Sequence, residues 1–203
     1  MKVSIADYGL PKSGAAVVGV LKGGKLLPGA QALDKATGGA LARAVKAGRF
    51  DGARGQWLEL LAPSGVELDR ILLAGLGEAK ALDDLAFEAV GGEAVQRLAR
   101  TGAKTATLVA DAIAGCPLAV EEAAAHMGLG ALLGSYRFGK YRTREKSADK
   151  PSLTGVSIAV KGAAKARRLY KMLEAVAAGV FLTRDVVSEP ANVIYPESLA
   201  AEC

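Results

Sequence analysis

Short apolar runs alternate with helical patterns along most of this 203-residue chain. The run at residues 70–74 continues as Gly-Leu-Gly, giving an almost wholly apolar stretch that is typical of a strand covered on both faces. Pro28 is tolerated best in an edge strand, so the run around it is assigned to an edge. We expect strands at residues 3–7, 15–22, 25–33, 56–62, 70–74, 105–110 and 157–160.

Helical periodicity and capping signals fill the intervals between these runs. Asp34 is suited to start one helix, and Asp83 or Asp84 is suited to start the next. The Gly38-Gly39 pair weakens the first of them. We expect helices at residues 34–46, 84–100, 118–133 and 163–187. In the last and longest, one face is apolar and carries Leu169, Met172, Val176, Val180 and Val187.

This order of elements predicts an α/β layered domain with a largely parallel or mixed sheet. The long helix is broken at Ser188–Pro190, because proline cannot continue it. Pro196 then begins another helix, which has barely two turns when the sequence stops at Cys203. We therefore expect the 203 residues to be a piece of a longer protein.

Composition excludes several classes of protein. Hydrophobic residues make up 51% of the chain and charged residues 23%, values that argue against disorder. No apolar run approaches the ~18 residues needed to cross a membrane, and the N-terminus does not look like a secretory signal. Cys116 and Cys203 are the two cysteines, so no disulfide framework is built in. We expect a reduced, cytoplasmic protein with no membrane partner.

Positive charge is concentrated in residues 137–150. Six basic residues and two acids there give +4 of the net +5. A solvated loop is the plainer interpretation of such a tract. The alternative is a nucleic-acid contact, because Tyr136, Phe138 and Tyr141 lie beside the charges. The residues that would then touch DNA are Arg137, Lys140, Arg142, Arg144 and Lys146.

No self-contained active site emerges from the motifs. Gly134–Tyr141 matches the GxxxxGK spacing of a phosphate loop, but it follows a predicted helix and has Tyr141 where magnesium needs Ser or Thr. Gly75 and Gly77 lack the third glycine of a dinucleotide fingerprint. Asp111, at a strand end, could bind a sugar hydroxyl, although such acids are normally solvated.

His126, the single histidine, has a plausible contact with Glu122 one helical turn away. A dyad of Cys116 and His126 is conceivable, but a small packed cysteine is the commoner case. The sequence contains no cluster of acids suited to a two-metal centre. We therefore predict no catalytic residue and no metal ligand in this chain.

Three stretches carry a family resemblance. The C-terminal one reads T-R-D-V-V-S-E-P-A-N-V-I-Y-P and matches the pattern R-D-L-V-N-x-P-x-N-x-x-x-P at Arg184, Asp185, Pro190, Asn192 and Pro196. Ser188 departs from it, since asparagine is frequent there. Residues 134–141 are similar to G-x-Y-x-F-x-x-Y, and residues 72–77 to a strand that ends in G-L-G. In this order, over residues 30–203, the chain resembles the leucyl (cytosol) aminopeptidases, peptidase family M17.

The resemblance implies a two-domain, generally hexameric cytoplasmic enzyme that removes N-terminal residues, often leucine, from peptides. Two divalent ions (zinc, manganese or magnesium) would be held in a C-terminal catalytic domain, partly by an N-T-D-A-E-G-R stretch that this sequence lacks. No metal-binding or catalytic residue of the family therefore carries over, and this chain should need no cofactor of its own.

The resemblance also implies the layout of the chain. Residues 1–160 would form a macro-domain-like α/β domain, a mixed sheet with helices on both faces. Residues 161–189 would be a linker helix, and residues 190–203 the start of the absent catalytic domain. The chain would pack on that domain, support the hexamer and limit which peptides enter. An ADP-ribose-type ligand site is suggested only by fold analogy.

Overall fold

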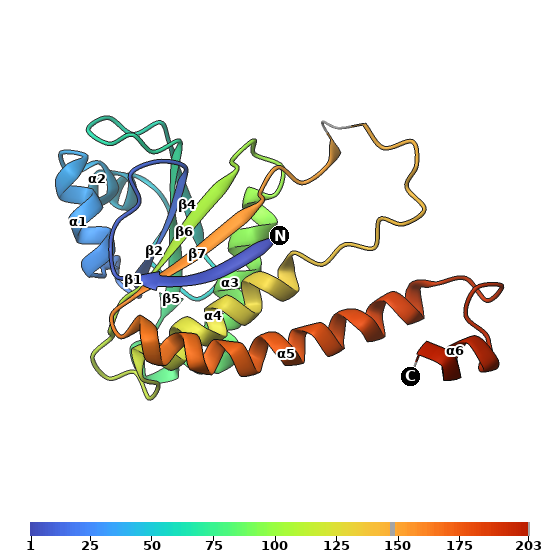
Figure 1. Cartoon of the computed structure of the whole chain (residues 1–203). Helices are drawn as coiled ribbons and strands as arrows, with labels where there is room; N and C mark the ends of the chain where they lie inside the picture. The colour runs from blue at the N-terminus through green and yellow to red at the C-terminus, as the bar shows by residue number, and fades with distance from the viewer. Residues whose placement is uncertain (147–148, 203) are drawn as a thin grey trace.

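The sheet of this protein has seven strands and is mixed in direction (Figure 1). The structure is a computed structural model, which describes residues 1–146 and 149–202. The strands run in the order β1-β7-β6-β2-β5-β4, with β3 paired to β2. The first five are mutually parallel, whereas β4 and β3 are antiparallel to their neighbours. Their bounds are β1 Lys2–Asp7, β2 Ala15–Leu21, β3 Lys25–Leu26, β4 Trp57–Leu61, β5 Arg70–Gly77, β6 Thr105–Ala110 and β7 Gly155–Val160.

Helices cover both faces of the sheet. On one face lie α1 (Pro28–Ala36) and α2 (Ala40–Ala47), and on the other α3 (Asp84–Leu98) and α4 (Val120–Gly134). A 3-10 turn (Ala79–Ala81) precedes α3, and α5 (Ala163–Ser188) and α6 (Pro196–Glu202) complete the chain. The predicted mixed α/β sheet with helices on both faces, followed by a long helix, is confirmed.

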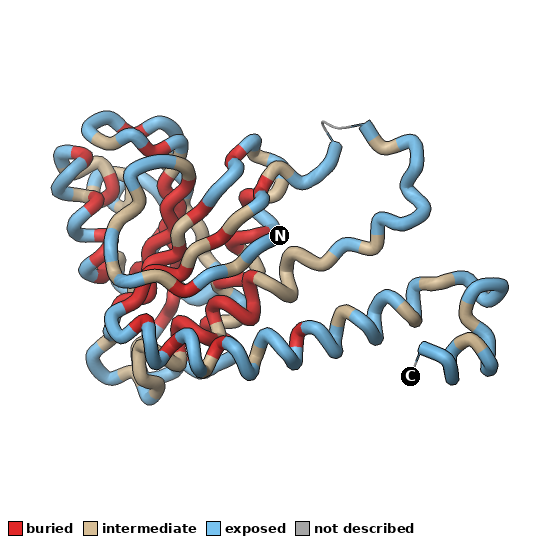
Figure 2. The backbone as a smooth tube through the Cα atoms, viewed as in Figure 1, coloured by how far each residue is buried: buried red, intermediate tan, exposed pale blue. Residues whose placement is uncertain are grey.

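Burial on both faces explains why the central strands are almost continuously apolar. In β2, Ala15 and Val17 pack with α3 and α4, whereas Val18 and Val20 pack with α1 and α2. Because alternate side chains of a strand point to opposite faces, a strand with helices on both sides needs apolar residues at every position. The buried residues accordingly concentrate in the sheet and along α4 (Figure 2).

The region from residue 25 to residue 46 differs from the prediction. The strand ends at Leu26, and α1 begins at Pro28, a position where the missing N–H costs nothing. Gly38 and Gly39 have φ of 61° and 83°, so they end α1 and begin α2 instead of lying inside one helix. Asp34 lies within α1, and its carboxylate accepts a hydrogen bond from the backbone N–H of Ala42 in α2 (2.9 Å).

The start of α3 agrees with the prediction. Asp83 is the N-cap, and its carboxylate accepts a hydrogen bond from the backbone N–H of Ala86 (2.7 Å). The helix ends at Leu98, two residues before the predicted end at residue 100, and Gly102 lies in the turn to β6 with φ of 86°.

Small residues let α3 and α4 approach each other closely. A Cβ added at Gly130 would overlap the backbone carbonyl of Glu88, and one added at Gly91 would overlap that of Met127. The two helix backbones are therefore in direct contact. This contact makes α3 and α4 one packed layer on the sheet.

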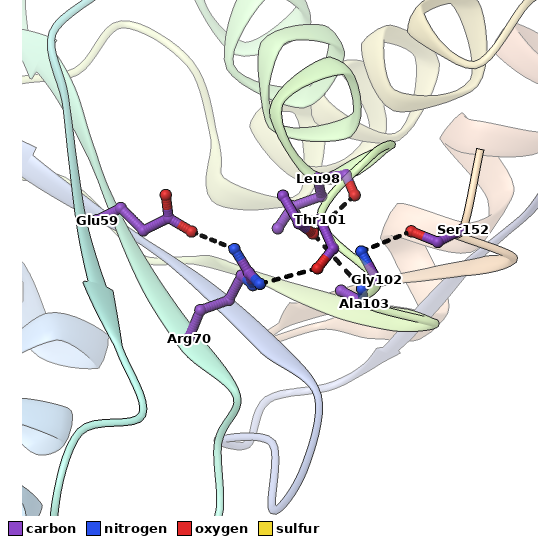
Figure 3. Close-up of polar contacts among 7 residues, drawn as sticks. All are labelled: Glu59, Arg70, Leu98, Thr101, Gly102, Ala103 and Ser152. Carbon is purple, nitrogen blue, oxygen red and sulfur yellow. Dashed lines mark hydrogen bonds and ion pairs between the residues drawn. The ribbon is translucent and has the colours of Figure 1, made fainter. Parts of the chain in front are cut away.

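Polar contacts join the sheet to the end of the basic tract (Figure 3). The Arg70 guanidinium on β5 donates to Glu59 on β4 (2.5 Å) and to the backbone carbonyl of Thr101 after α3 (3.0 Å). The Ser152 hydroxyl accepts a hydrogen bond from the backbone N–H of Gly102 in the same turn (3.1 Å). The loop that begins after α4 is thus fixed again at Ser152, just before β7.

Over residues 1–146 and 149–202, no helix has both the length and the apolar composition that a membrane span requires.

Candidate functional site

Most of the apolar face predicted for α5 does not pack on the domain: Leu169 is half-buried against the core, whereas the other four residues lie outside it. Met172 and Val187 are 73% and 79% exposed, and Val176 and Val180 are exposed as well. We call these four residues the α5 stripe. The buried residues of α5 lie on a neighbouring face and are Ala163, Ala166, Tyr170 and Ala177.

Close packing explains which face of α5 is buried. The Tyr170 ring lies against Gly128 of α4, where a Cβ would come within 2.9 Å of two ring carbons. Alanines on α5 and a glycine on α4 let the two helices approach closely. The larger aliphatic side chains of α5 remain outside this contact. The α5 stripe is consequently an apolar surface that no described residue covers.

The loop after α4 folds onto the C-terminal half of α5. The Tyr136 hydroxyl donates to the Asp185 carboxylate (2.8 Å), and the Arg184 guanidinium lies 4.0 Å from the centre of the Tyr136 ring. The Phe181 ring is 5.2 Å away from that centre. Tyr136 therefore combines a hydrogen bond, a cation–π contact and an aromatic contact.

A second set of contacts lies a few residues further along. Lys140 Nζ donates to the Glu189 carboxylate (2.6 Å), and the Tyr141 hydroxyl donates to the same carboxylate. These two hydrogen bonds hold the pKa of Glu189 below its usual range. The two motifs at residues 134–141 and 184–196, which look independent in the sequence, thus meet in space. Tyr136 and Tyr141 both contact the end of α5.

The structure divides the five basic residues considered for DNA binding. Arg137 pairs with Glu145, and Lys140 is used by Glu189. Arg142, Arg144 and Lys146 are exposed and form no ion pair within residues 1–146 and 149–202. A nucleic-acid contact through them stays a prediction.

Asp111 is not solvated, contrary to the plainer expectation. It is 7% exposed and accepts hydrogen bonds from the Tyr8 hydroxyl (2.7 Å) and the backbone N–H of Gly29 (3.0 Å). Gly29 lies in the first turn of α1, where a negative charge is favourable. Burial nevertheless raises the pKa of Asp111. The cavity beside it has a volume of about 20 Å³, far too small for a nucleotide.

His126 contacts a different acid from the one predicted. Its Nδ1 lies 2.8 Å from a carboxylate oxygen of Glu88 on α3, so the pair joins two helices. Glu122 instead accepts a hydrogen bond from the backbone N–H of Ala119 (3.0 Å) and caps α4. Cys116 is half-buried in the turn before α4. The described part of the chain contains no group of three or more His, Cys, Asp or Glu residues that could hold a metal ion.

The glycine motifs have structural roles. The motif Gly134–Tyr141 begins at the last residue of α4 and continues into a loop, which is the wrong context for a phosphate loop. Gly75 and Gly77 lie inside β5, and the backbone of residues 52–56 packs so close to Gly75 that a side chain would not fit. Glycine at Gly75 therefore serves backbone packing.

Removal of the hydroxyl should have opposite effects at half-buried Tyr8 and at buried Tyr170. Tyr8→Phe should destabilise the chain by about 2 kcal/mol, because the buried Asp111 carboxylate loses a donor. Tyr170→Phe should be neutral or stabilise by up to ~1 kcal/mol, because its buried hydroxyl has no hydrogen-bond partner among the described residues. Urea denaturation of the two variants measures both effects. Equal destabilisation would contradict the assignment.

High pH supplies a second measurement for Tyr170. Burial raises the pKa of Tyr170 from 10.0 to about 12, with a smaller contribution from Glu174. Below pH 10 the Tyr170 hydroxyl is protonated in both the folded and the unfolded chain, so the stability is at its full value. As the pH rises from 10 to about 12, the unfolded tyrosine ionises first, and the free energy of unfolding falls. Tyr170→Phe should therefore lose less stability than the wild type between pH 10 and 12.

This chain is similar to the proteins of a known family. The family model described as the N-terminal domain of the cytosol aminopeptidase family matches residues 17–145. The chain belongs to this family. A probable cytosol aminopeptidase of Caulobacter vibrioides is 39% identical over 203 residues, which cover 99% of this chain and 40% of the relative. One of Rhizobium meliloti is 38% identical over 196 residues, covering 94% of this chain and 38% of the relative.

Solved structures agree with the family assignment. A tomato leucine aminopeptidase mutant superimposes with a TM-score of 0.81 at 25% identity, covering 99% of this chain and 41% of that one. The bottromycin maturation enzyme BotP shares the fold, with a TM-score of 0.68 at 24% identity over 93% of this chain and 36% of its own. This family member therefore spans about two fifths of the length of the curated relatives it matches.

Proposed function

We propose that this chain is the non-catalytic N-terminal domain of a longer, metal-dependent leucyl aminopeptidase. The exposed α5 stripe is the observation that carries the proposal. A row of exposed valine and methionine side chains along one helix is typical of a surface that another domain covers. Exposed Val193, Tyr195 and Leu199 extend apolar surface into the C-terminal segment. The relatives, all named probable cytosol aminopeptidases, have the additional length that such a domain requires.

In this proposal the parts of the chain have separate roles. Residues 1–160 form the α/β domain, residues 161–189 link it to the next domain, and residues 190–203 begin the catalytic domain. Docking on the α5 stripe would orient the catalytic domain, help to hold a hexamer and limit which peptides enter. The relatives' names also support a cytoplasmic location.

The metal ions of such an enzyme would belong to the other domain. Leucine aminopeptidase chemistry is proposed to need two divalent ions, and one solved BotP structure is a complex with Mn. The buried or half-buried acids of this chain do not fit such a centre, because they already serve structural partners. Asp111 binds Gly29, Glu122 binds Ala119, and Glu88 contacts His126.

The proposal predicts that the purified chain has no peptidase activity of its own. With added manganese or zinc, it should release no leucine from a leucyl p-nitroanilide above a buffer blank, because the residues that the structure describes contain no cluster of carboxylates that could hold the ions. The gene should continue beyond the codon for residue 203 into carboxylate-rich metal motifs. Metal-dependent release of leucine by this chain, abolished by a chelator, would contradict the proposal, as would a stop codon at that position.

A second candidate function is DNA binding through residues 137–150. Arg142 and Arg144, together with Arg100, line an open hollow of about 650 Å³. Glu145 and Asp149 also line this hollow, but Arg142 and Arg144 form no ion pair in the part of the chain that the structure describes, which supports an electrostatic contact with phosphates. The chain should then bind duplex DNA at ~50 mM salt, with affinity that falls steeply as salt rises.

Substitutions distinguish a localised contact from general charge. The logarithm of the DNA-binding constant falls linearly with the logarithm of the salt concentration. Replacing Arg142 and Arg144 by alanine should reduce the magnitude of this slope by about 0.9 per lost phosphate contact. Lys25→Ala, an exposed cation on β3, should leave it unchanged. Absence of binding at ~50 mM salt would remove this function.

A further inference from the structure

The last turns of α5 extend beyond the packed part of the domain (Figure 1). Ala177 is the final buried residue of this helix. After it, Phe181 and Val186 are half-buried, and the other residues up to Ser188 are exposed (Figure 2). Contacts with the sheet and with the buried face of α4 therefore cannot set the direction of this end of the helix.

In the described part of the chain, one short segment, residues 136–141, supplies the aromatic contact, the cation–π contact and the long-range side-chain hydrogen bonds to this end of the helix. This segment directly follows α4, and α4 packs along the first half of α5. Tyr136 contacts Phe181, Arg184 and Asp185, and Lys140 and Tyr141 contact Glu189. The contacts therefore cover the last two turns of α5 and the residue that caps it.

The charges at this end of α5 need such partners. Asp185 and Glu189 are carboxylates near a helix C-terminus, where the helix dipole disfavours negative charge. The last turn contains no basic residue that would compensate. Lys140 supplies the missing positive charge from outside the helix. The Glu189 side chain is only 10% exposed, so its carboxylate is bonded mainly by these two donors and not by water.

We propose that residues 136–141 act as a strap that fixes the direction in which the C-terminal half of α5 leaves the domain. Tyr136 of the strap lies among three side chains of α5. Lys140 and Tyr141 of the strap bind Glu189, the C-cap residue of α5. The orientation of Val180 and Val187 in the α5 stripe then depends on a loop 40 to 50 residues earlier in the chain. Only the value of that orientation for docking rests on the proposed function; the strap itself does not.

Amide hydrogen exchange of the chain, followed by mass spectrometry, tests the strap. Two variants remove its contacts separately: Tyr136→Phe removes the hydrogen bond to Asp185, and Lys140→Ala with Tyr141→Phe removes both donors to Glu189. We expect amides of residues 182–188 to exchange about five- to tenfold faster in the double variant, with a smaller increase in Tyr136→Phe. Amides of residues 166–174 should not change, because Tyr170 and the neighbouring alanines hold that half.

Matched variants make the test specific. Arg142→Ala lies in the same loop but forms no ion pair in the described part of the chain, so its exchange should equal that of the wild type. Lys140→Arg should keep the slow exchange, because it keeps the positive charge beside Glu189. Unchanged exchange at residues 182–188 in both strap variants would overturn the proposal, as would an equal rise along the whole of α5. The aminopeptidase assay does not enter this test, so the two proposals fail independently.

Discussion

Gly130→Ala is expected to destabilise the chain by about 3 kcal/mol or more. The added Cβ would overlap the carbonyl oxygen, carbonyl carbon and Cα of Glu88, all of them backbone atoms of α3. A flexible side chain could move aside, but a helix backbone cannot do so without separating α3 from α4. Urea denaturation followed by circular dichroism gives the free energy of unfolding for comparison with the wild type.

Gly179→Ala is the matched control for this substitution. Gly179 lies in α5, and a Cβ built there meets nothing within 4 Å. Alanine favours the helix over glycine by roughly 0.5–1 kcal/mol, so this variant should be slightly more stable than the wild type. If Gly179→Ala lost as much stability as Gly130→Ala, the loss at Gly130 could not be attributed to overlap with the α3 backbone. The close α3–α4 contact would then be refuted.

Leu108→Ala is expected to cost 2–5 kcal/mol, through lost burial and the cavity that remains. Leu108 has 0% exposure and lies in β6, between β7 and β2, where it packs in the core shared with α3 and α4. The measurement is again the free energy of unfolding in urea. If the slope with denaturant is unchanged, the shift in midpoint reports stability alone.

Leu85→Ala distinguishes burial from residue type. Leu85 is 62% exposed at the start of α3, so truncation there should change stability by less than about 0.5 kcal/mol. Similar effects at Leu85 and Leu108 would contradict the assignment of β6 to the centre of the core.

Strands were predictable wherever the apolar pattern was local and strong. The wholly apolar stretch around residues 71–77 indicates a strand covered on both faces, and β5 is buried on both. The helix starts at Asp83 and Pro196 follow from side chains acting on their own backbone. The assignment failed between residues 25 and 46 for two reasons: Pro28 was placed in an edge strand although it begins α1, and Gly38-Gly39 was placed inside one helix. Two successive left-handed glycines end a helix and begin another.

The candidate surfaces were less predictable than the strands. Periodicity placed the residues of the α5 stripe on one face, but it could not say that this face is exposed. The helical repeat gave His126 a neighbour at Glu122, whereas the tertiary structure gives it Glu88 on another helix. The basic tract was visible as charge, yet the use of Lys140 by Glu189 needed the path of the chain.

The sequence by itself determined the layered α/β class and the family, because periodicity, composition and motifs are properties of neighbouring residues. The tertiary structure alone decided which face of α5 is buried and that Tyr136 meets Asp185 49 residues away. Both depend on how closely two helices approach. That distance is set by the small side chains of Gly128 and the α5 alanines in combination, and no single stretch of sequence contains it.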